Sequence, residues 1–208
     1  MLAREATLSV FDFETTGVVE DFAAEPWQFG IVEMRGGIIV AESQSAGFMR
    51  VGERPFSPHA PGTWMQHLDE IAAAPSRVDW WPHFEQRLHC DAIVAHSVGT
   101  EKKILRHIAP LHRHGPWIDT LKLSRLAFPD WKSHALEDAI PKLGLLASVR
   151  EICPGRAPHD ALFDAVAAAV LLEHLLTLDG WHDATVEALA AARPRAYHAQ
   201  RRIGRARL

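Results

Sequence analysis

The stretch VFDFETTG near the start of the chain constrains the fold most, because it places two acids inside a strongly apolar strand. Side chains alternate between the two faces of a β-strand, so Asp12 and Glu14 share one face while Phe11 and Phe13 share the other. Apolar residues on both faces predict a central strand that is covered on both sides. The polar TTG that follows marks the end of the strand, so both carboxylates are expected at its mouth.

Two ionised carboxylates held close together repel each other, and burial increases the cost. Asp12 and Glu14 are therefore expected to be protonated or to share a cation, and hard divalent cations such as Mg²⁺ and Mn²⁺ favour oxygen ligands. An edge strand carrying two solvated acids is the alternative interpretation. The apolar residues that flank both acids argue against it.

The composition is that of one globular domain with a full core, at 208 residues and 48% hydrophobic. Cys90 and Cys153 lie far apart, which predicts neither a disulfide framework nor a structural zinc site and favours a reducing, cytoplasmic location. The first strand is predicted to begin within about six residues, so we expect no signal peptide. Asp164 and Glu173 interrupt the most apolar late segment, so we expect no membrane segment.

The formal net charge of −4 conceals a basic C-terminal end. Residues 193–208 carry six arginines and no acid, which leaves a charge of −10 on residues 1–192. We therefore expect a domain over residues 1–192 and a basic tail over residues 193–208. Such an acidic body does not attract polyanions in general, so a nucleic-acid substrate would need local attraction from bound metal or from the tail. A solvated chain end is the alternative for the tail.

The hydrophobic pattern predicts an α/β fold that begins with an antiparallel meander. WQFGIVEM and IIVAESQSAGFM are typical of two strands joined at a glycine hairpin, and residues 51–75 predict a long loop that ends in a short helical piece over 64–73. VDWWPHFEQRLHC predicts an amphipathic helix interrupted at Pro82. Helices then follow short strands: DAIVAH and WIDT are expected strands, and EKKILRHIA, TLKLSRLAF, HALEDAIPKLG, HDALFDAVAAAVLLEHLL and WHDATVEALAAA are expected helices.

Three separated segments carry the chemistry. FDFETTG supplies Asp12 and Glu14, VAHSVGTEKKIL supplies Glu101, and HDALFDA supplies His159 and Asp164. Several acids that hold two cations, together with one group that deprotonates water, make up the inventory of a two-metal phosphoryl-transfer site. His107, His112 and His114 have no metal-ligand spacing, so a surface loop is expected there.

Taken in this order, the three segments resemble the motifs of the DEDDh 3′-to-5′ exonucleases, the group that includes the proofreading epsilon subunit of bacterial DNA polymerase III. The resemblance covers residues 7–177. In the middle motif, AHSVGTE has Ser97 where the family usually has asparagine and Glu101 where it has aspartate. The resemblance implies an α/β, ribonuclease-H-like mixed sheet, in which three antiparallel strands are followed by parallel strands, with helices on both faces.

The resemblance also implies roles for the motif residues. Two divalent cations, Mg²⁺ or Mn²⁺, would be held by four acids: Asp12, Glu14, Glu101 and Asp164. Asp12 would bridge the two cations. His159 would be the general base, and its spacing of five from Asp164 places it at the start of the helix. A solvated helix-capping role is the alternative for His159. The loop that meets the terminal nucleotide would consist of Thr15, Thr16, Gly17 and Val18. Its backbone amides would bind the 3′ hydroxyl, and the Val18 side chain would lie against the last base.

The implied function is a metal-dependent exonuclease that releases nucleoside 5′-monophosphates from the 3′ ends of single-stranded nucleic acid. We expect DNA rather than RNA as the strand, and a DNA polymerase as a further candidate partner. Three alternatives stay open. They are a catalytically weak subunit that binds 3′ ends or serves a polymerase, an exonuclease acting on RNA or short oligonucleotides, and a hydrolase of a small phosphodiester.

Overall fold

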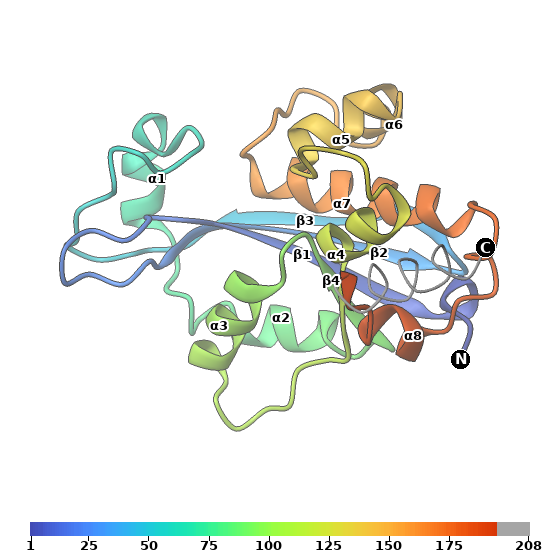
Figure 1. Ribbon diagram of the computed structural model, residues 1–208. Helices are drawn as coiled ribbons and strands as arrows, with labels where there is room; N and C mark the ends of the chain where they lie inside the picture. The colour runs from blue at the N-terminus through green and yellow to red at the C-terminus, as the bar shows by residue number, and fades with distance from the viewer. Residues whose placement is uncertain (195–208) are drawn as a thin grey trace.

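A computed structural model describes residues 1–194 of the chain, which form a five-stranded mixed sheet in the order β3-β2-β1-β4-β5 (Figure 1). The strands are β1 (Thr7–Thr15), β2 (Pro26–Arg35), β3 (Ile38–Phe48), β4 (Ala92–Ala95) and β5 (Trp117–Asp119). β1, β2 and β3 pair antiparallel, whereas β4 runs parallel to β1 and β5 parallel to β4. The predicted fold class, three antiparallel strands followed by parallel strands, is confirmed.

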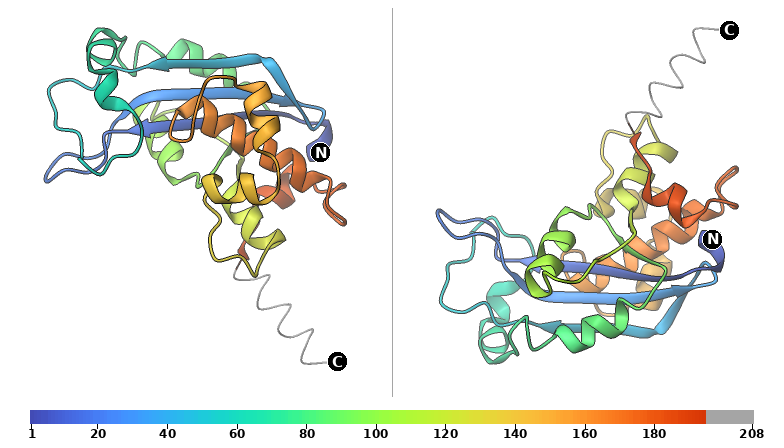
Figure 2. Two further views of the ribbon diagram at one scale, coloured as in Figure 1. Left: turned by 90° about the horizontal axis from the view of Figure 1, so that it is seen from above. Right: turned by 90° about the horizontal axis from the view of Figure 1, so that it is seen from below.

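Helices cover both faces of this sheet. They are η1 (Ala3–Glu5), η2 (Trp64–Gln66), α1 (Leu68–Ala73), α2 (Trp81–Arg87), α3 (Gly99–Ile108), α4 (Thr120–Ala127), α5 (Leu136–Lys142), α6 (Leu146–Ile152), α7 (Ala161–Leu176) and α8 (Val186–Ala190). α5, α6 and α7 lie on one face of the sheet, and α2 and α3 lie on the other (Figures 1 and 2). None of the helices within residues 1–194 is long and apolar enough to cross a membrane.

The two faces of β1 belong to two separate parts of the core. Leu8 and Val10 are fully buried in the cluster that contains the apolar residues of α7. Phe11 and Phe13 belong instead to the cluster that contains Phe84 of α2 and the apolar residues of α3. The alternation read from the sequence is therefore confirmed, and it places Asp12 on the α7 face of the central strand.

Two helix predictions were wrong in detail, and one helix was missed. Pro82 lies in the first turn of α2 and does not interrupt a longer helix. Proline is tolerated there because the N–H group that it lacks would have no acceptor within the helix. The last helix is only five residues long, since Thr185 caps α8 and residues 181–184 form turns before it. α6 was not predicted at all. Except for Arg193 and Pro194, the predicted basic tail lies outside the described residues.

α7 begins one residue after Asp160, and that start positions the third motif. The Asp160 carboxylate accepts hydrogen bonds from the backbone N–H groups of Leu162 and Phe163, at 3.0 and 3.2 Å. Aspartate favours this position because its oxygens satisfy donors that the first helical turn leaves free. His159 therefore lies just outside the helix, in the left-handed conformation with φ of 64°.

Candidate active site

Asp12 and Glu14 lie at the C-terminal end of β1, at the centre of the sheet. Asp12 stands opposite Gly30 in the antiparallel ladder with β2, and Glu14 stands opposite Gln28. Glu14 is only 6% exposed. β4 runs parallel to β1 and leads into α3, so the start of α3 reaches the same end of the sheet.

The pKa values of Asp12 and Glu14 are raised by burial and by the other motif acids. Burial raises the pKa of Asp12 well above its usual value, and the charges of Asp164, Glu101 and Glu14 raise it further. Burial and the charge of Asp164 likewise raise the pKa of Glu14 to about 8. The structure thus brings together four carboxylates that the chain separates by as many as 152 positions, the interval from Asp12 to Asp164.

Glu101 is the most deeply buried acid of the four. It lies in the first turn of α3 and is 3% exposed, and burial raises its pKa to about 8, with a further contribution from the charge of Asp119. Its Oε2 atom has no hydrogen-bond partner among the described residues. A buried carboxylate oxygen without a partner is costly, and coordination to a cation would remove that cost.

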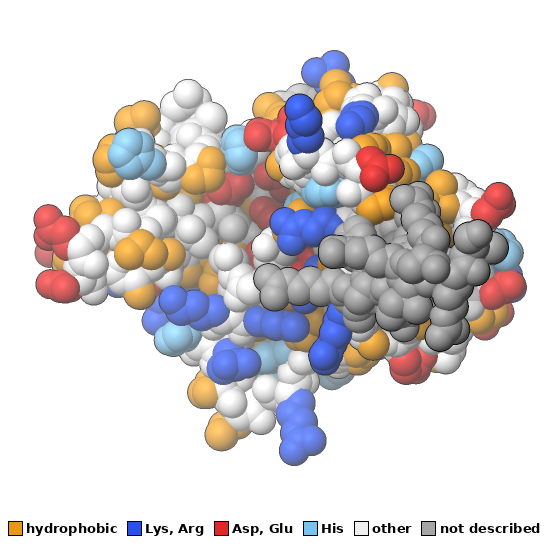
Figure 3. Space-filling model, viewed as in Figure 1, with side chains coloured by type: hydrophobic (Ala, Val, Ile, Leu, Met, Phe, Trp, Pro, Cys, Tyr) orange, Lys and Arg blue, Asp and Glu red, His pale blue; other side chains and the backbone are white. Residues whose placement is uncertain are grey.

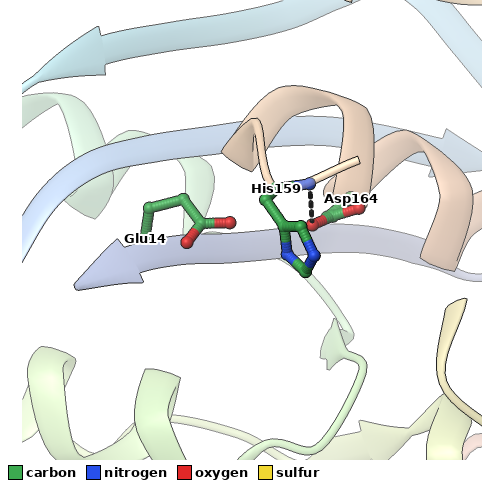
Figure 4. A group of neighbouring side chains, drawn as sticks. All are labelled: Glu14, His159 and Asp164. Atoms are coloured by element: carbon green, nitrogen blue, oxygen red, sulfur yellow. Dashed lines mark hydrogen bonds between the residues drawn. The ribbon is translucent and has the colours of Figure 1, made fainter. Parts of the chain in front are cut away.

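His159 and Asp164 converge on Glu14 from the start of α7 (Figure 4). One ligand atom from each of these three residues lies within 4.8 Å of the others, the only such grouping found within residues 1–194. The backbone N–H of His159 donates to Oδ2 of Asp164 at 3.1 Å. Burial raises the pKa of Asp164 to about 6 even though that hydrogen bond stabilises its charged form.

This donor set fits divalent cations. It consists of carboxylate oxygens and one imidazole, with an oxygen of Glu101 that lacks a partner within the described chain. Hard cations such as Mg²⁺ and Mn²⁺ prefer such oxygen ligands. Without a cation, the raised pKa values keep protons on these carboxyl groups, and the charge of a bound cation would take the place of those protons. Asp12, Glu14, Glu101 and Asp164 are the residues that would hold them.

The loop predicted to meet the terminal nucleotide has two hydrogen-bonded amides and one exposed side chain. Thr16 is buried, and its N–H donates to the carbonyl of Glu25 at 2.9 Å, so this amide is not free for a ligand. Gly17 has φ of +70°, and a Cβ there would lie 2.7 Å from the Cβ of Ser57. Val18 is 71% exposed beyond this turn, and the hydroxyl of Thr15 accepts from the Gly17 amide at 3.4 Å.

Residues that sequence reasoning missed position the start of α7. Gln28 of β2 donates from Nε2 to Asp160 at 3.0 Å and accepts from the N–H of Ala161 at 3.1 Å. Arg156 donates to both oxygens of the same aspartate, at 2.8 and 2.7 Å. The preference of aspartate for helix N-termini could have predicted that Asp160 caps α7. For Gln28, a single glutamine within an apolar strand, the sequence gave no indication of its role.

The position of Ser97, where the related motif usually carries asparagine, is left-handed with φ of 72°. Asparagine adopts that conformation more readily than serine. In this chain the Ser97 amide donates to Oδ1 of Asp119 at 3.1 Å, a contact that helps to hold the turn before α3. The turn is therefore kept although the residue differs.

Comparisons with known proteins agree with this geometry. No protein-family model matches the chain. It is 28% identical over 187 residues to the PolC-type DNA polymerase III of Bacillus cereus and 28% identical over 188 residues to that of Bacillus subtilis, in each case over 84% of this chain. The chain spans only 12% of the length of these relatives.

Solved structures share the fold. Exonuclease X in complex with 5′ overhanging duplex DNA matches at 26% identity with a TM-score of 0.66, over 88% of this chain and 97% of that one. The nuclease domain of 3′hExo, a DEDDh family member bound to rAMP, matches at 17% identity with a TM-score of 0.60, over 88% and 98%.

A third match is Exonuclease I of E. coli in complex with a dT13 oligonucleotide, at 14% identity with a TM-score of 0.63, over 94% of this chain and 43% of that one. At these low identities, the last two matches show the fold alone. This chain is therefore similar, over most of its length, to the DEDDh 3′-to-5′ exonucleases, as its motifs, its fold and these matches agree.

Proposed function

We propose that this chain is a metal-dependent 3′-to-5′ exonuclease that releases nucleoside 5′-monophosphates from single-stranded DNA ends. The observation that carries the proposal is the crowding of four carboxylates at the end of β1, where burial raises the pKa of every one of them and the charges of the other acids further raise the pKa of Asp12 and Glu14. Such a cluster is unfavourable without protons or cations, so it is better explained as a ligand set than as part of the core.

Asp12, Glu14, Glu101 and Asp164 would hold two divalent cations in this proposal. When bound, such cations make water more acidic and stabilise the negative charge that develops on the attacking and leaving oxygens. Asp12 has the central place, since the charges of the other three acids all act on it. Glu101 reaches the cluster from α3 on the opposite face of the sheet.

His159 is the proposed general base. Its ring lies beside Glu14 and Asp164, and it is exposed enough to exchange a proton with solvent. It would accept a proton from the water that attacks the last phosphodiester. The bond from phosphorus to the 3′ oxygen of the preceding nucleotide then breaks, which releases the terminal 5′-monophosphate and leaves a new 3′ hydroxyl.

The terminal nucleotide would lie against residues 15–18. The exposed Val18 side chain is placed to contact the last base, and Gly17 lets the backbone approach the sugar. Because the Thr16 amide donates to Glu25 and the Gly17 amide donates to the Thr15 hydroxyl, contacts to the 3′ hydroxyl would come from Thr15 and from the Val18 amide. We place the activity in the cytoplasm, as the cysteine usage suggests, and infer a DNA polymerase as a partner from the similarity to PolC-type polymerases.

A second candidate function is a subunit that binds 3′ ends or a polymerase with weak catalysis. Glu101 favours it, because its side chain is longer than the aspartate of the related motif and would change the geometry of a metal site. An exonuclease acting on RNA is the other candidate, since no residue of the site distinguishes the two sugars by charge or size.

A degradation assay tests these proposals. Single strands of DNA and RNA carrying a label at the 3′ or the 5′ end are incubated with Mg²⁺ or Mn²⁺ and with a chelator. We expect immediate release of labelled mononucleotide from 3′-labelled DNA, a descending ladder from 5′-labelled DNA, and neither product with chelator. Binding without release would support the accessory subunit, and faster release from RNA would reassign the substrate.

A further inference from the structure

A basic hollow lies beside α3, the helix whose first turn carries Glu101. Its volume is about 490 Å³, and its lining consists of Lys102, Arg106, Pro110, His112, Arg113, His114 and Trp117, from α3, β5 and the loop between them. We call it the α3 hollow. In Figure 3, lysine and arginine side chains gather beneath the recess in which acidic side chains are visible, over the region of α3.

The cations of the α3 hollow lack acidic partners. Within residues 1–194, no carboxylate lies within 4.0 Å of Lys102, Arg106 or Arg113 in an ion pair. Lys102 and Arg106 are four residues apart on one helix, a spacing at which like charges destabilise the helix. Residues 1–192 carry a net charge of −10, so this cationic surface opposes the overall charge of the domain.

Other cations lie close to these. Burial and the charges of Lys122 and Arg106 lower the pKa of Lys102, whereas the charge of Asp119 raises it, so all three cations and this aspartate share one neighbourhood. Lys122 is exposed on α4, with Nζ at 3.4 Å from Oδ2 of Asp119. The positive surface therefore extends from α3 across the end of β5 to α4.

Aromatic rings accompany the charges. Nζ of Lys102 lies 5.5 Å from the centre of the Trp117 ring, a cation–π contact. The rings of His112 and His114 are stacked at 6.3 Å, and Trp81 lies 4.7 Å from His112. Glu85 is an acid that contacts these rings, with Oε1 at 3.5 Å from Nε2 of His112. Cationic surfaces interleaved with rings are typical of single-strand binding proteins.

We propose that the α3 hollow binds the phosphodiester backbone of the strand whose 3′ end occupies the acidic site. The inference rests on the proposed function for the direction of the strand. Lys102 directly follows Glu101, and the ten residues of α3 span about 15 Å, so the cations lead outward from the site. An acidic protein is the alternative ligand for these cations. Nucleic acid is favoured because the cations lie on the helix that carries Glu101 and because aromatic rings lie beside them.

The test removes the two cations farthest from the acids. In the full chain, Arg106→Ala/Arg113→Ala should weaken binding of a 5′-fluorescein-labelled oligothymidylate by about 25-fold at 0.1 M salt, because each single-strand phosphate contact contributes a slope of about −0.7 to log affinity against log salt. The salt slope should fall by about 1.4. Fluorescence anisotropy in EDTA measures both quantities without hydrolysis.

Two control variants separate charge from fold. Arg106→Lys/Arg113→Lys keeps the charges and should retain most of the affinity, whereas loss of affinity there would contradict a phosphate contact. Arg35→Ala/Arg150→Ala removes the same net charge elsewhere. Arg35 lies opposite Thr7 at the far end of β1, and α6, which carries Arg150, lies on the opposite face of the sheet from α3 (Figure 1). This control should bind like the natural chain.

Failure of this inference is distinguishable from failure of the proposed function. Unchanged affinity and slope in Arg106→Ala/Arg113→Ala would overturn the inference even if the chain releases mononucleotides normally. Conversely, a natural chain that releases no nucleotide with Mg²⁺ or Mn²⁺, yet loses affinity in this variant, would keep the binding surface and overturn the exonuclease.

Discussion

Gly30 of β2 lies against the backbone of Ala161 at the start of α7: a Cβ at position 30 would come within 2.2 Å of the Ala161 carbonyl carbon and oxygen. Gly30 is also the residue opposite Asp12 in the β1–β2 ladder. The absence of a side chain at this one position therefore lets α7 approach the sheet beside Asp12. That approach brings Asp164 and His159 to the acids of β1.

Gly30→Ala should destabilise the protein by about 3 kcal/mol or more, since the atoms it meets belong to backbone and cannot rotate away. It should also lower turnover, because α7 would shift away from Asp12. Urea denaturation and the rate of mononucleotide release measure the two effects. Gly99→Ala is the control for stability, since no atom lies within 4 Å of a Cβ there. Equal destabilisation in both variants would contradict the steric argument.

The stability of the metal-free protein should fall as the pH rises. The pKa is about 8 for Glu14 and Glu101 and about 6 for Asp164, against about 4 in an unfolded chain. The folded chain thus binds more protons at these three acids between these values, so the stability that they contribute is greatest at about pH 4 and below and declines up to about pH 8. Melting temperatures in EDTA across this range should show the decline.

Mg²⁺ or Mn²⁺ should raise the melting temperature more at pH 8 than at pH 5, because protons no longer compete for the acids at the higher pH. Asp12→Asn should reduce both the decline with pH and the gain with metal, and it should abolish nucleotide release while the chain stays folded. An equal gain from metal at both pH values would contradict the assignment of these acids as ligands.

Glu101→Gln should strongly depress activity with either cation, because a neutral amide cannot replace a buried carboxylate ligand. Glu101→Asp should instead change the ratio of the rates with Mg²⁺ and Mn²⁺, since the carboxylate would retract by about 1.5 Å while Mg²⁺ demands near-ideal octahedral geometry. We expect Mn²⁺ to support the higher rate in the natural chain. Unchanged rates in Glu101→Gln would favour the accessory-subunit candidate.

His159→Ala should lower turnover by about 10²–10⁴-fold and leave the gain in melting temperature with Mg²⁺ largely unchanged, because its proposed role is proton transfer. Single-turnover rates and thermal melts separate the two effects. A rate close to that of the natural chain would mean that another group is the base.

Glu137→Ala should have a smaller effect on the same step. Oε2 of Glu137 lies 3.4 Å from Nε2 of His159, so the carboxylate restrains the orientation of the ring. We expect kcat to fall by about tenfold with little change in KM, by analogy with partners that orient a catalytic imidazole. Glu151→Ala, which removes an exposed acid from α6, is the control and should leave kcat unchanged.

The local pattern of the sequence determined the central strand and the face on which its acids lie. The alternation of side chains along β1 has a period of two, and Leu8 and Phe11 pack on the faces that it predicts. The alternation is a pattern within one short segment, so no tertiary contact is needed to read it. The mixed sheet was implied by the resemblance of the three motifs to the DEDDh exonucleases.

Only the tertiary structure decided which distant residues meet. Gln28 contacts Asp160 across 132 positions, and Glu137 faces His159 because α5 packs beside the start of α7. The depth at which Glu101 is buried, and hence its pKa, likewise depends on how α3 packs against the end of β1. No period or motif encodes these contacts, since they arise when elements with separate local patterns pack around one core.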